Sequence, residues 1–273
     1  MIDAGAWSRV NVEKEHHMRS MNWKAAAIGV LTTMLFATAT AQAQTPTPTP
    51  TPADHSPWSL EVGVGWDNGI AGHINSSGIG EINDQAVVIT ANTYEEVYGT
   101  GLHLRFGGGY ALSPETEIVG AFAFQSLDAD QVTPMGDIGV SNLYGKYTDY
   151  QAFGLDVGMR RYAKFSTTFR LYGEGTLGLG FVDKTDVTLV APGANLTRDA
   201  NDFYDQTAAW AAGANVGLLF QTAGRMGFFG QLGLRYLSGM AEVDDLVGTG
   251  LETINDKSSR WTMPFVAGAR MRF

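Results

Sequence analysis

The last fourteen residues of the chain, 260–273 (RWTMPFVAGARMRF), alternate between two kinds of side chain with a period of two residues. Every second residue counted back from Phe273 is apolar, whereas the residues between are arginine, glycine, threonine, proline and valine. A period of two is that of a β-strand, because successive side chains of a strand point to opposite faces of its sheet. The sequence therefore predicts that the chain ends in a strand with one wholly apolar face.

Seven earlier segments show the same alternation, so that eight strands are predicted in all. These segments are 58–67, 100–112, 116–126, 151–162, 169–181, 209–220 and 227–236. One face of each is apolar, and the opposite face is rich in glycine and carries isolated charges. The second face of a soluble β-sandwich would meet water and carry many lysine, glutamate and threonine side chains. A glycine-rich face with few charges instead fits the narrow interior of a small closed barrel.

The connections between these segments alternate in length. Residues 113–116, 163–167 and 221–225 form short turns, whereas 68–96, 127–148, 183–206 and 238–258 are long. This layout is typical of transmembrane β-barrels, in which closure satisfies every backbone donor in lipid. We therefore expect an all-β fold, an up-and-down antiparallel transmembrane barrel of eight strands over residues 58–273. The segments 85–91 and 186–191 also resemble strands, which either extend above the membrane or bring the barrel to ten strands.

The N-terminal region has the features of a secretory signal. Lys24 precedes an apolar run over 25–36, and the sequence AQA at 41–43 is a small-residue cleavage site. The run is shorter than the roughly 20 residues of a membrane-spanning helix. We expect residues 1–43 to hold a cleaved signal peptide that truly starts at Met18 or Met21, with a non-native extension upstream. The Thr-Pro repeat within 44–57 is expected to form an extended periplasmic tether.

Composition narrows the functions that the chain can have. There is no cysteine, which rules out disulfides, thiol catalysis, cysteine-based zinc sites and a lipid anchor on cysteine. The net charge of −10 argues against a nucleic-acid partner, because phosphate contacts require a basic face. The four long connections together carry a charge of −13. Oxygen ligands in such loops suit a divalent cation, but no calcium-loop spacing is present, and we expect neither a metal nor a cofactor.

Two sets of side chains follow from the alternation. Aromatic residues at the ends of the predicted strands are expected to mark the membrane interface. They are Trp58, Trp66, Tyr110, Trp210, Phe220, Tyr236 and Trp261. Charged residues on the opposite faces are expected to fill the interior as a network of salt bridges, because buried charges must pair. They are Glu61, His103, Arg105, Asp156, Arg160, Arg170, Glu174, Arg235 and Arg270, with Arg260 and Arg272 facing the interior or its mouths.

Three features carry a resemblance to a known family: the eight alternating segments, the turn YALSPETEIVGAF at 110–122, and the ending FVAGARMRF at 265–273. With them, the region 58–273 resembles the small eight-stranded outer-membrane β-barrel proteins. This porin-like group includes the outer membrane protein A barrel and the opacity-type adhesins. The resemblance implies a Gram-negative outer membrane, with lipopolysaccharide among the surrounding lipids. It also implies that Phe273 is the assembly signal read by the barrel-insertion machinery, and we expect a monomer.

Three functions are compatible with such a barrel. We expect a structural or surface-interaction role, with long acidic surface-exposed loops and an interior filled by side chains. The alternative is a small-solute porin with a narrow polar pore. A third hypothesis, a lipid-modifying enzyme, depends on His73 near Ser76 and Ser77 in the first long connection. A histidine beside serines in a glycine-rich loop is a weak signal, and we predict no enzymatic activity.

Pro264 conflicts with the predicted last strand. A strand inside a closed barrel pairs on both sides, whereas proline has no amide hydrogen to donate and is normally confined to edges and bulges. We therefore expect a bulge or a gap in strand pairing at Pro264, near the outer rim of the barrel.

Overall fold

The computed structural model describes residues 56–130, 132–164, 166, 168–222, 224–242, 246–255 and 258–273. The predicted signal peptide, its upstream extension and the tether up to residue 55 lie outside the described residues. The chain divides into two units, Met1–Asp54 and His55–Phe273, and the second unit holds all the elements below.

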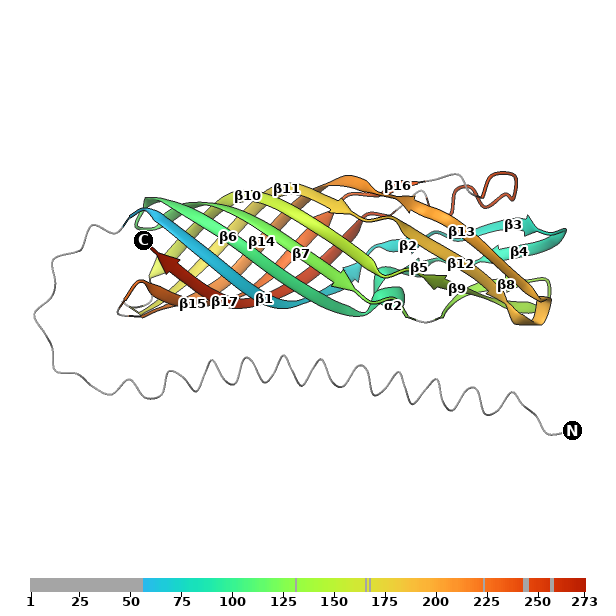
Figure 1. Ribbon diagram of the computed structural model, residues 1–273, viewed down its shortest axis with the longest axis horizontal. Helices are drawn as coiled ribbons and strands as arrows, with labels where there is room; N and C mark the ends of the chain where they lie inside the picture. Colours follow the sequence, from blue (N-terminus) through green and yellow to red (C-terminus); the bar gives the residue numbers. More distant parts are fainter. Residues whose placement is uncertain are drawn as a thin grey trace, which may run out of the picture. The chain divides into compact units, whose positions relative to one another are not determined.

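Eight long strands of this unit close into a barrel (Figure 1). They are β1 (Trp58–Ala71), β6 (Thr100–Ser113), β7 (Thr116–Leu127), β10 (Tyr150–Lys164), β11 (Phe169–Val182), β14 (Thr207–Gln221), β15 (Met226–Leu237) and β17 (Arg260–Arg272). Each strand is antiparallel to its neighbours, and β1 pairs with β17 to complete the ring. The predicted fold class is confirmed: the barrel has eight strands, and the alternative of ten is wrong.

The long connections form a second sheet beyond one end of the barrel (Figure 1). Its strands, in spatial order, are β16 (Ala241–Glu242), β13 (Leu196–Asp205), β12 (Thr185–Ala191), β9 (Ser141–Tyr147), β8 (Thr133–Ile138), β4 (Gln85–Ile89) and β3 (Gly78–Ile82). We call it the distal sheet. The segments 85–91 and 186–191 belong to it as β4 and β12. The prediction of loops is therefore wrong for much of the first three connections, whose other segments are also extended and paired, whereas the segment 246–255 of the fourth consists mostly of turns.

Shorter elements complete the long connections. β2 (His73–Asn75) and β5 (Asn92–Thr93) form a two-stranded ribbon, and the helix α2 (Tyr94–Tyr98) follows β5 at the barrel end. A short 3-10 turn, η1 (Pro192–Ala194), joins β12 to β13. In the described part of the chain, no helix is long and apolar enough to cross a membrane.

The distal sheet has a hydrophobic core of its own. Its inward side chains are almost completely buried together with residues of α2, of the segment 246–255 and of the adjoining barrel ends. Among them are Val87, Ile89, Met135, Leu143, Leu189, Val97, Leu251 and Ile254. The contact between β3 and the segment 246–255 requires glycine, since a Cβ at Gly80 would come within 2.2 Å of the Thr249 carbonyl oxygen. The distal sheet is thus a folded layer that continues the barrel wall.

The outer wall of the barrel is apolar on every strand. Leucine, valine, phenylalanine and methionine side chains of the barrel strands point outward and are exposed. Examples are Leu60, Val62, Phe106, Phe122, Val157, Leu177, Val216, Leu232 and Met263. A soluble protein rarely exposes a continuous apolar surface of this size, whereas a transmembrane barrel presents an apolar band to lipid.

The predicted gap at Pro264 is confirmed. β15 and β17 pair on either side of it, at Leu232↔Phe265 and Arg235↔Thr262, in an unchanged register, but the two pairs between are missing. On its other side Pro264 remains in register with Asp67 of β1. Gly233 lies across the gap, and a Cβ there would be 3.2 Å from the proline ring. The missing donor is therefore accommodated without a bulge.

Truncation of Leu143 tests whether the distal sheet is held by its own core. Leu143 is fully buried, so Leu143→Ala should cost the distal sheet about 2–5 kcal/mol. We expect faster hydrogen exchange and faster proteolysis across β8 and β9, with unchanged heat-modifiable gel mobility of the barrel. Val140→Ala, at the fully exposed tip of the same hairpin, is the matched control. Equal protection in both variants would contradict a core at Leu143.

Candidate functional site in the barrel interior

Strand register brings opposite charges together inside the barrel. Residues directly opposite each other in an antiparallel pair share one face of the sheet. Arg160 of β10 lies opposite Glu117 of β7 on one side and opposite Glu174 of β11 on the other. Glu61 of β1 lies opposite Arg270 of β17. The alternation that makes the outer wall apolar thus also places acids and bases on neighbouring inward positions.

Arg160 is the centre of this arrangement. It is 1% exposed, and its Nε and Nη2 atoms donate to Glu174 Oε2 at 2.8 and 2.6 Å. Its Nη2 also donates to Glu61 Oε2 at 2.9 Å, and its Nη1 donates to Glu61 Oε1. Arg105 adds a bond to Glu174 Oε1 at 2.8 Å. The guanidinium of Arg160 lies 4.5 Å from the centre of the Tyr172 ring.

Glu117 and Arg270 extend the network toward the short turns. Arg270 donates to Glu117 at 2.5 Å and lies 3.3 Å from Glu61. Glu117 also accepts from the hydroxyls of Ser59 and Tyr162, each at 2.7 Å. The carboxylates of Glu61, Glu117 and Glu174 and the guanidiniums of Arg105, Arg160 and Arg270 form what we call the central charge cluster. It is buried, and its positive and negative charges are equal in number.

Toward the distal sheet the interior holds two smaller polar groups. Asp156 pairs with Arg235 at 2.5 Å. Asp67 accepts hydrogen bonds from Thr262 at 3.2 Å and from the Gln125 amide. Two further contacts complete the second group: His103 Nδ1 lies 3.7 Å from Asp67, and Gln125 accepts from Arg260 Nη2 at 2.9 Å. Gln125 therefore joins Asp67 to Arg260.

Aromatic side chains lie at the distal end of the interior. The guanidinium of Arg260 stacks on the Tyr150 ring at 3.9 Å and lies 5.4 Å from the Tyr94 ring. The Tyr94 hydroxyl donates to the Ser258 carbonyl at 2.9 Å, and Tyr98 packs against Tyr150. A capping box between Thr93 and Glu96 fixes the start of α2. Burial raises the pKa of Tyr94 and of Tyr98.

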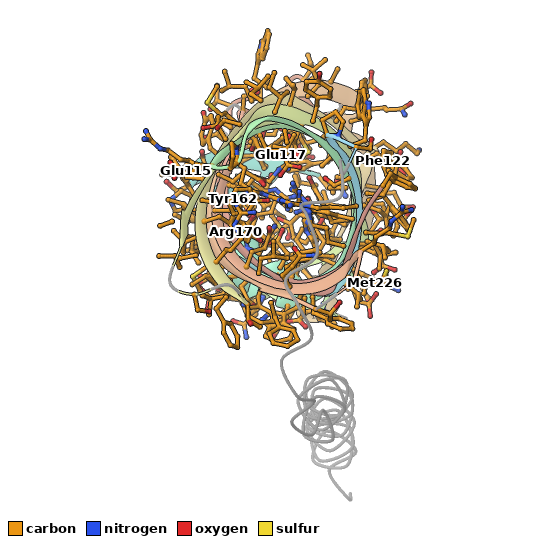
Figure 2. All side chains as sticks on the ribbon, turned by 90° about the vertical axis from the view of Figure 1, so that its left-hand side faces the viewer. Glu115, Glu117, Phe122, Tyr162, Arg170 and Met226 are labelled. Carbon is orange, nitrogen blue, oxygen red and sulfur yellow. The ribbon has the colours of Figure 1, made fainter. Side chains whose placement is uncertain are left out.

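The structure groups the predicted interior residues unevenly. Glu61, Arg105, Arg160, Glu174 and Arg270 meet in the central charge cluster, whereas Asp156 and Arg235 form a separate pair, and His103 lies beside Asp67. Arg170 joins none of these groups: it donates to the Pro114 carbonyl oxygen and stacks on the Tyr162 ring at 4.0 Å. Figure 2 shows Glu117, Tyr162 and Arg170 pointing into the barrel from its wall.

Several interior residues were not predicted from the sequence, among them Glu117, Asp67 and Tyr162. Glu117 follows a turn, but it alternates with the outward Ile118, and that parity was the available signal. Asp67 is the last residue of the predicted first segment. It follows the outward Trp66 directly and therefore points inward. Tyr162 is inward because it shares its parity with Arg160. None of these three differs in residue type from an interface or loop residue, so only its position in the strand reveals it.

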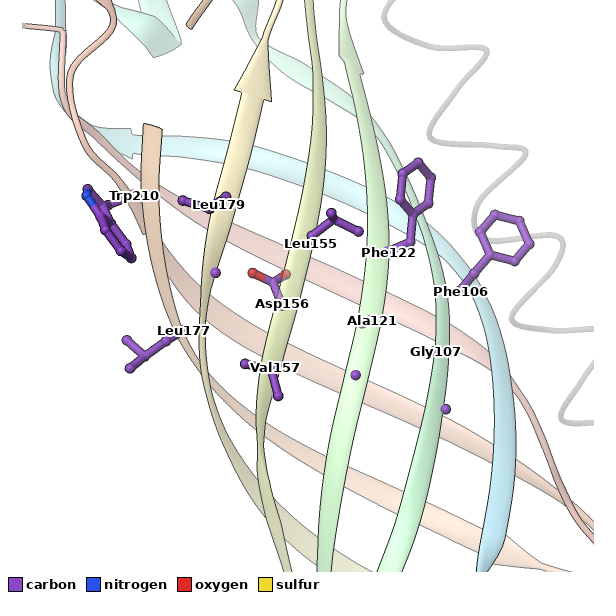
Figure 3. A pocket seen from close by; sticks show the side chains of 13 residues that line it. Phe106, Gly107, Ala121, Phe122, Leu155, Asp156, Val157, Leu177, Leu179 and Trp210 are labelled. Atoms are coloured by element: carbon purple, nitrogen blue, oxygen red, sulfur yellow. The ribbon is translucent and has the colours of Figure 1, made fainter. Parts of the chain in front are cut away.

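The predicted interface aromatics lie on the outer wall, mostly in pairs and near the strand ends, except that Trp66 lies within β1, which continues to Ala71. Trp58 packs edge-on against Tyr110 at 4.9 Å, and Trp66 stacks on Phe265 at 4.5 Å. Two pairs lie on other strands: Tyr236 with Trp261 at 5.0 Å, and Phe220 with Phe169 at 5.1 Å. Trp210 is 71% exposed and borders a shallow apolar concavity of about 720 Å³ on the outer wall (Figure 3).

The residues behind the enzyme and metal hypotheses form no reactive arrangement in the described part of the chain. His73 opens β2 opposite Thr93, and no hydrogen bond joins it to Ser76 or Ser77 among the described residues. The backbone amide of Ser76 donates to the Ile254 carbonyl at 2.5 Å. Within the same described ranges, no group of three or more histidine and acidic side chains is placed to hold a metal ion.

No protein-family model and no curated protein matches the sequence. Among solved structures, Neisserial surface protein A matches with 8% identity over 81% of this chain and 100% of that chain, at a TM-score of 0.43. The outer membrane protein OprG from Pseudomonas aeruginosa matches with 11% identity over 80% and 97%, at 0.41. The outer membrane protease OmpT from Escherichia coli matches with 8% identity over 84% and 99%, at 0.37.

The predicted resemblance in fold to small eight-stranded barrels is confirmed by the strand pairing of this chain. Identities this low say nothing about activity. The absence of enzymatic activity stays a prediction.

Arg160→Met tests whether the central charge cluster holds the barrel together. The variant leaves Glu61 and Glu174 buried without the two hydrogen bonds that each accepts from Arg160, which should cost about 3–5 kcal/mol. We expect that loss in the free energy of unfolding measured by urea titration in lipid vesicles. Arg161→Met, on the exposed side of the same strand, is the control and should change it by less than about 0.5 kcal/mol. Equal losses of unfolding free energy in Arg160→Met and Arg161→Met would contradict a stabilising role of the buried ion pairs.

The buried tyrosines predict a limit to stability in alkali. Burial raises the pKa of Tyr94 and Tyr147 above the ordinary value of 10.0, so the folded state resists their ionisation. The stabilisation is therefore complete below pH 10 and is lost as the pH rises above it. We expect their tyrosinate absorbance to appear only together with loss of distal-sheet structure. Tyr147→Phe should remove part of this late absorbance; ionisation of every tyrosine near pH 10 in the folded protein would contradict the prediction.

Proposed function

We propose that the chain is an outer-membrane barrel that acts through surface interaction by its distal sheet, and not through conduction. The observation that supports this most directly is the combination of a side-chain-filled interior with a folded sheet at one end. A narrow barrel has room for side chains and little else. The residues that would line a pore are instead buried in mutual ion pairs.

The outer wall and the chain ends support the location. An apolar wall bounded by aromatic pairs suits a bilayer with two interfaces. The sequence before β1 has the pattern of a secretory signal. β1 begins and β17 ends at the short-turn end of the barrel, which we assign to the periplasm (Figure 1). The distal sheet would then project from the cell surface.

The assembly proposal concerns the last strand. The amide of Phe273 donates to the Trp58 carbonyl at 3.2 Å, so the terminal residue closes the ring at its periplasmic rim. Its side chain is exposed on the outer wall, where the barrel-insertion machinery could contact it before closure. We propose that the barrel is a monomer with lipopolysaccharide around its surface end.

The exposed face of the distal sheet suggests the chemistry of a partner. Ile79 and Val88 pair directly across β3 and β4 on this face, and Ile79 is 76% exposed. Glu81 and Asp137 lie exposed beside them. Paired apolar side chains flanked by carboxylates suit a partner that offers apolar groups flanked by basic ones.

Two readouts on one preparation test the proposal. In planar lipid bilayers the chain should produce no steady conductance, whereas a porin control of larger bore conducts. Cells that display the chain should retain a cationic amphipathic peptide in a salt-sensitive manner, because surface charges are screened by salt. The variant Glu81→Gln with Asp137→Asn should retain less of it.

The variant Glu95→Gln with Asp84→Asn is matched in charge, lies outside the apolar pair, and is the control. Stable conductance steps in the wild type would favour the small-solute porin. Equal retention by the two variants would show that the acidic surface as a whole, and not this face, binds the peptide.

A further inference from the structure

The charges of the barrel interior balance everywhere except at the short-turn mouth. The central charge cluster has equal numbers of acids and bases. Asp156 neutralises Arg235, and Asp67 is joined to Arg260 through Gln125. Two arginines are left over at the mouth: among the described residues, no carboxylate forms an ion pair with Arg170 or Arg272.

These two arginines lie at the same end of the barrel. Arg170 is next to the first residue of β11, and Arg272 is the last residue of β17, opposite Ser59. Arg170 is 8% exposed, its guanidinium is stacked on Tyr162, and its Nε has no hydrogen-bond partner. Arg272 is half-buried and shares its strand parity with the inward Arg270. In Figure 2, which looks into this end, Arg170 and Tyr162 project into the opening.

The acid at this mouth is already engaged. Glu117 accepts hydrogen bonds from Ser59 and Arg270 at Oε1 and from Tyr162 at Oε2, so both of its carboxylate oxygens already have partners. The guanidiniums of Arg170 and Arg270 both lie near the Tyr162 ring, at 4.0 and 5.6 Å from its centre. The Nε of Arg270 is buried without a partner, like that of Arg170. Buried cations without a counter-charge are costly, so an anion taken up from solution would lower the free energy of this mouth.

We propose that the short-turn mouth binds one phosphate group between Arg170 and Arg272. A guanidinium offers paired N–H donors that match the oxygens of phosphate, and a dianion would neutralise both surplus charges. The phosphate could be inorganic or could belong to a lipid headgroup of the adjoining leaflet. This site lies at the opposite end from the distal sheet and does not depend on the function proposed for that sheet.

Calorimetry tests the site on the chain purified from membranes in phosphate-free detergent. Sodium phosphate, titrated at constant ionic strength against a sodium chloride reference, should give a saturable heat with about one equivalent bound. Arg272→Gln and Arg170→Gln should each weaken the affinity at least tenfold, and Arg272→Lys should weaken it less. Arg161→Gln removes an exposed arginine near the same end and should leave the affinity unchanged. Heat-modifiable gel mobility shows which variants are folded.

A second arm distinguishes the source of the phosphate. Native mass spectrometry of the protein from nanodiscs that contain phosphatidic acid should show a retained lipid that Arg272→Gln releases, if the ligand is a headgroup. Saturable heat with inorganic phosphate supports the site for a soluble ligand, and arginine-dependent lipid retention supports it for a headgroup. The proposal is overturned if neither occurs, or if binding is equal in Arg272→Gln and Arg161→Gln.

Discussion

The pairing of Arg160 with carboxylates on both neighbouring strands is the interaction on which the barrel interior depends. Desolvating one guanidinium in so narrow a space is costly, and the cost is offset only when carboxylates surround it. Cross-strand register provides them, since Glu117 and Glu174 lie directly opposite Arg160. A shift of register by one residue would place glycine, Thr116 or Ile118 opposite Arg160, so that Arg160 would lose its carboxylates. The charged interior and the apolar exterior are therefore two results of the same register.

A closed and neutral interior leaves the two ends of the barrel as the places where the molecule can interact. At the distal end, β9, β12 and β13 are separated from the adjacent barrel strands by at most two residues, so the barrel wall passes almost directly into the distal sheet. A surface built in this way is already ordered. Binding on it does not require the ordering of long flexible loops, which would reduce affinity. At the other end the strands stop at short turns, and one of the two surplus arginines, Arg170, is held in place by Tyr162 and Pro114.

The sequence was sufficient to predict the eight barrel strands because each carries its alternation over ten or more residues. It was also sufficient for the pairing gap at Pro264, which follows from a missing donor in a doubly paired strand. It could not predict most of the distal sheet. The strand Thr133–Ile138 contains Pro134 and Gly136, and the strand Leu196–Asp205 is mostly polar, so neither has a clear period. Both strands are held by pairing with segments that are distant in the sequence; β8, for example, pairs with β4. Such long-range pairing cannot be predicted from the local pattern of residues.

The interior charges show the same division between local pattern and long-range pairing. Parity along each strand indicates that Arg160, Arg170 and Arg270 point inward, but parity does not say which carboxylate each one meets. That depends on register: Arg270 lies opposite Glu61, whereas Arg170 lies opposite Leu219 and Lys164 and has no acid directly opposite it on either neighbouring strand. Arg270 and Arg170 thus have the same signature in the sequence. Arg270 forms structural ion pairs, whereas Arg170 is a surplus charge. A charge that the register leaves without a partner is where a narrow, filled barrel is open to a ligand.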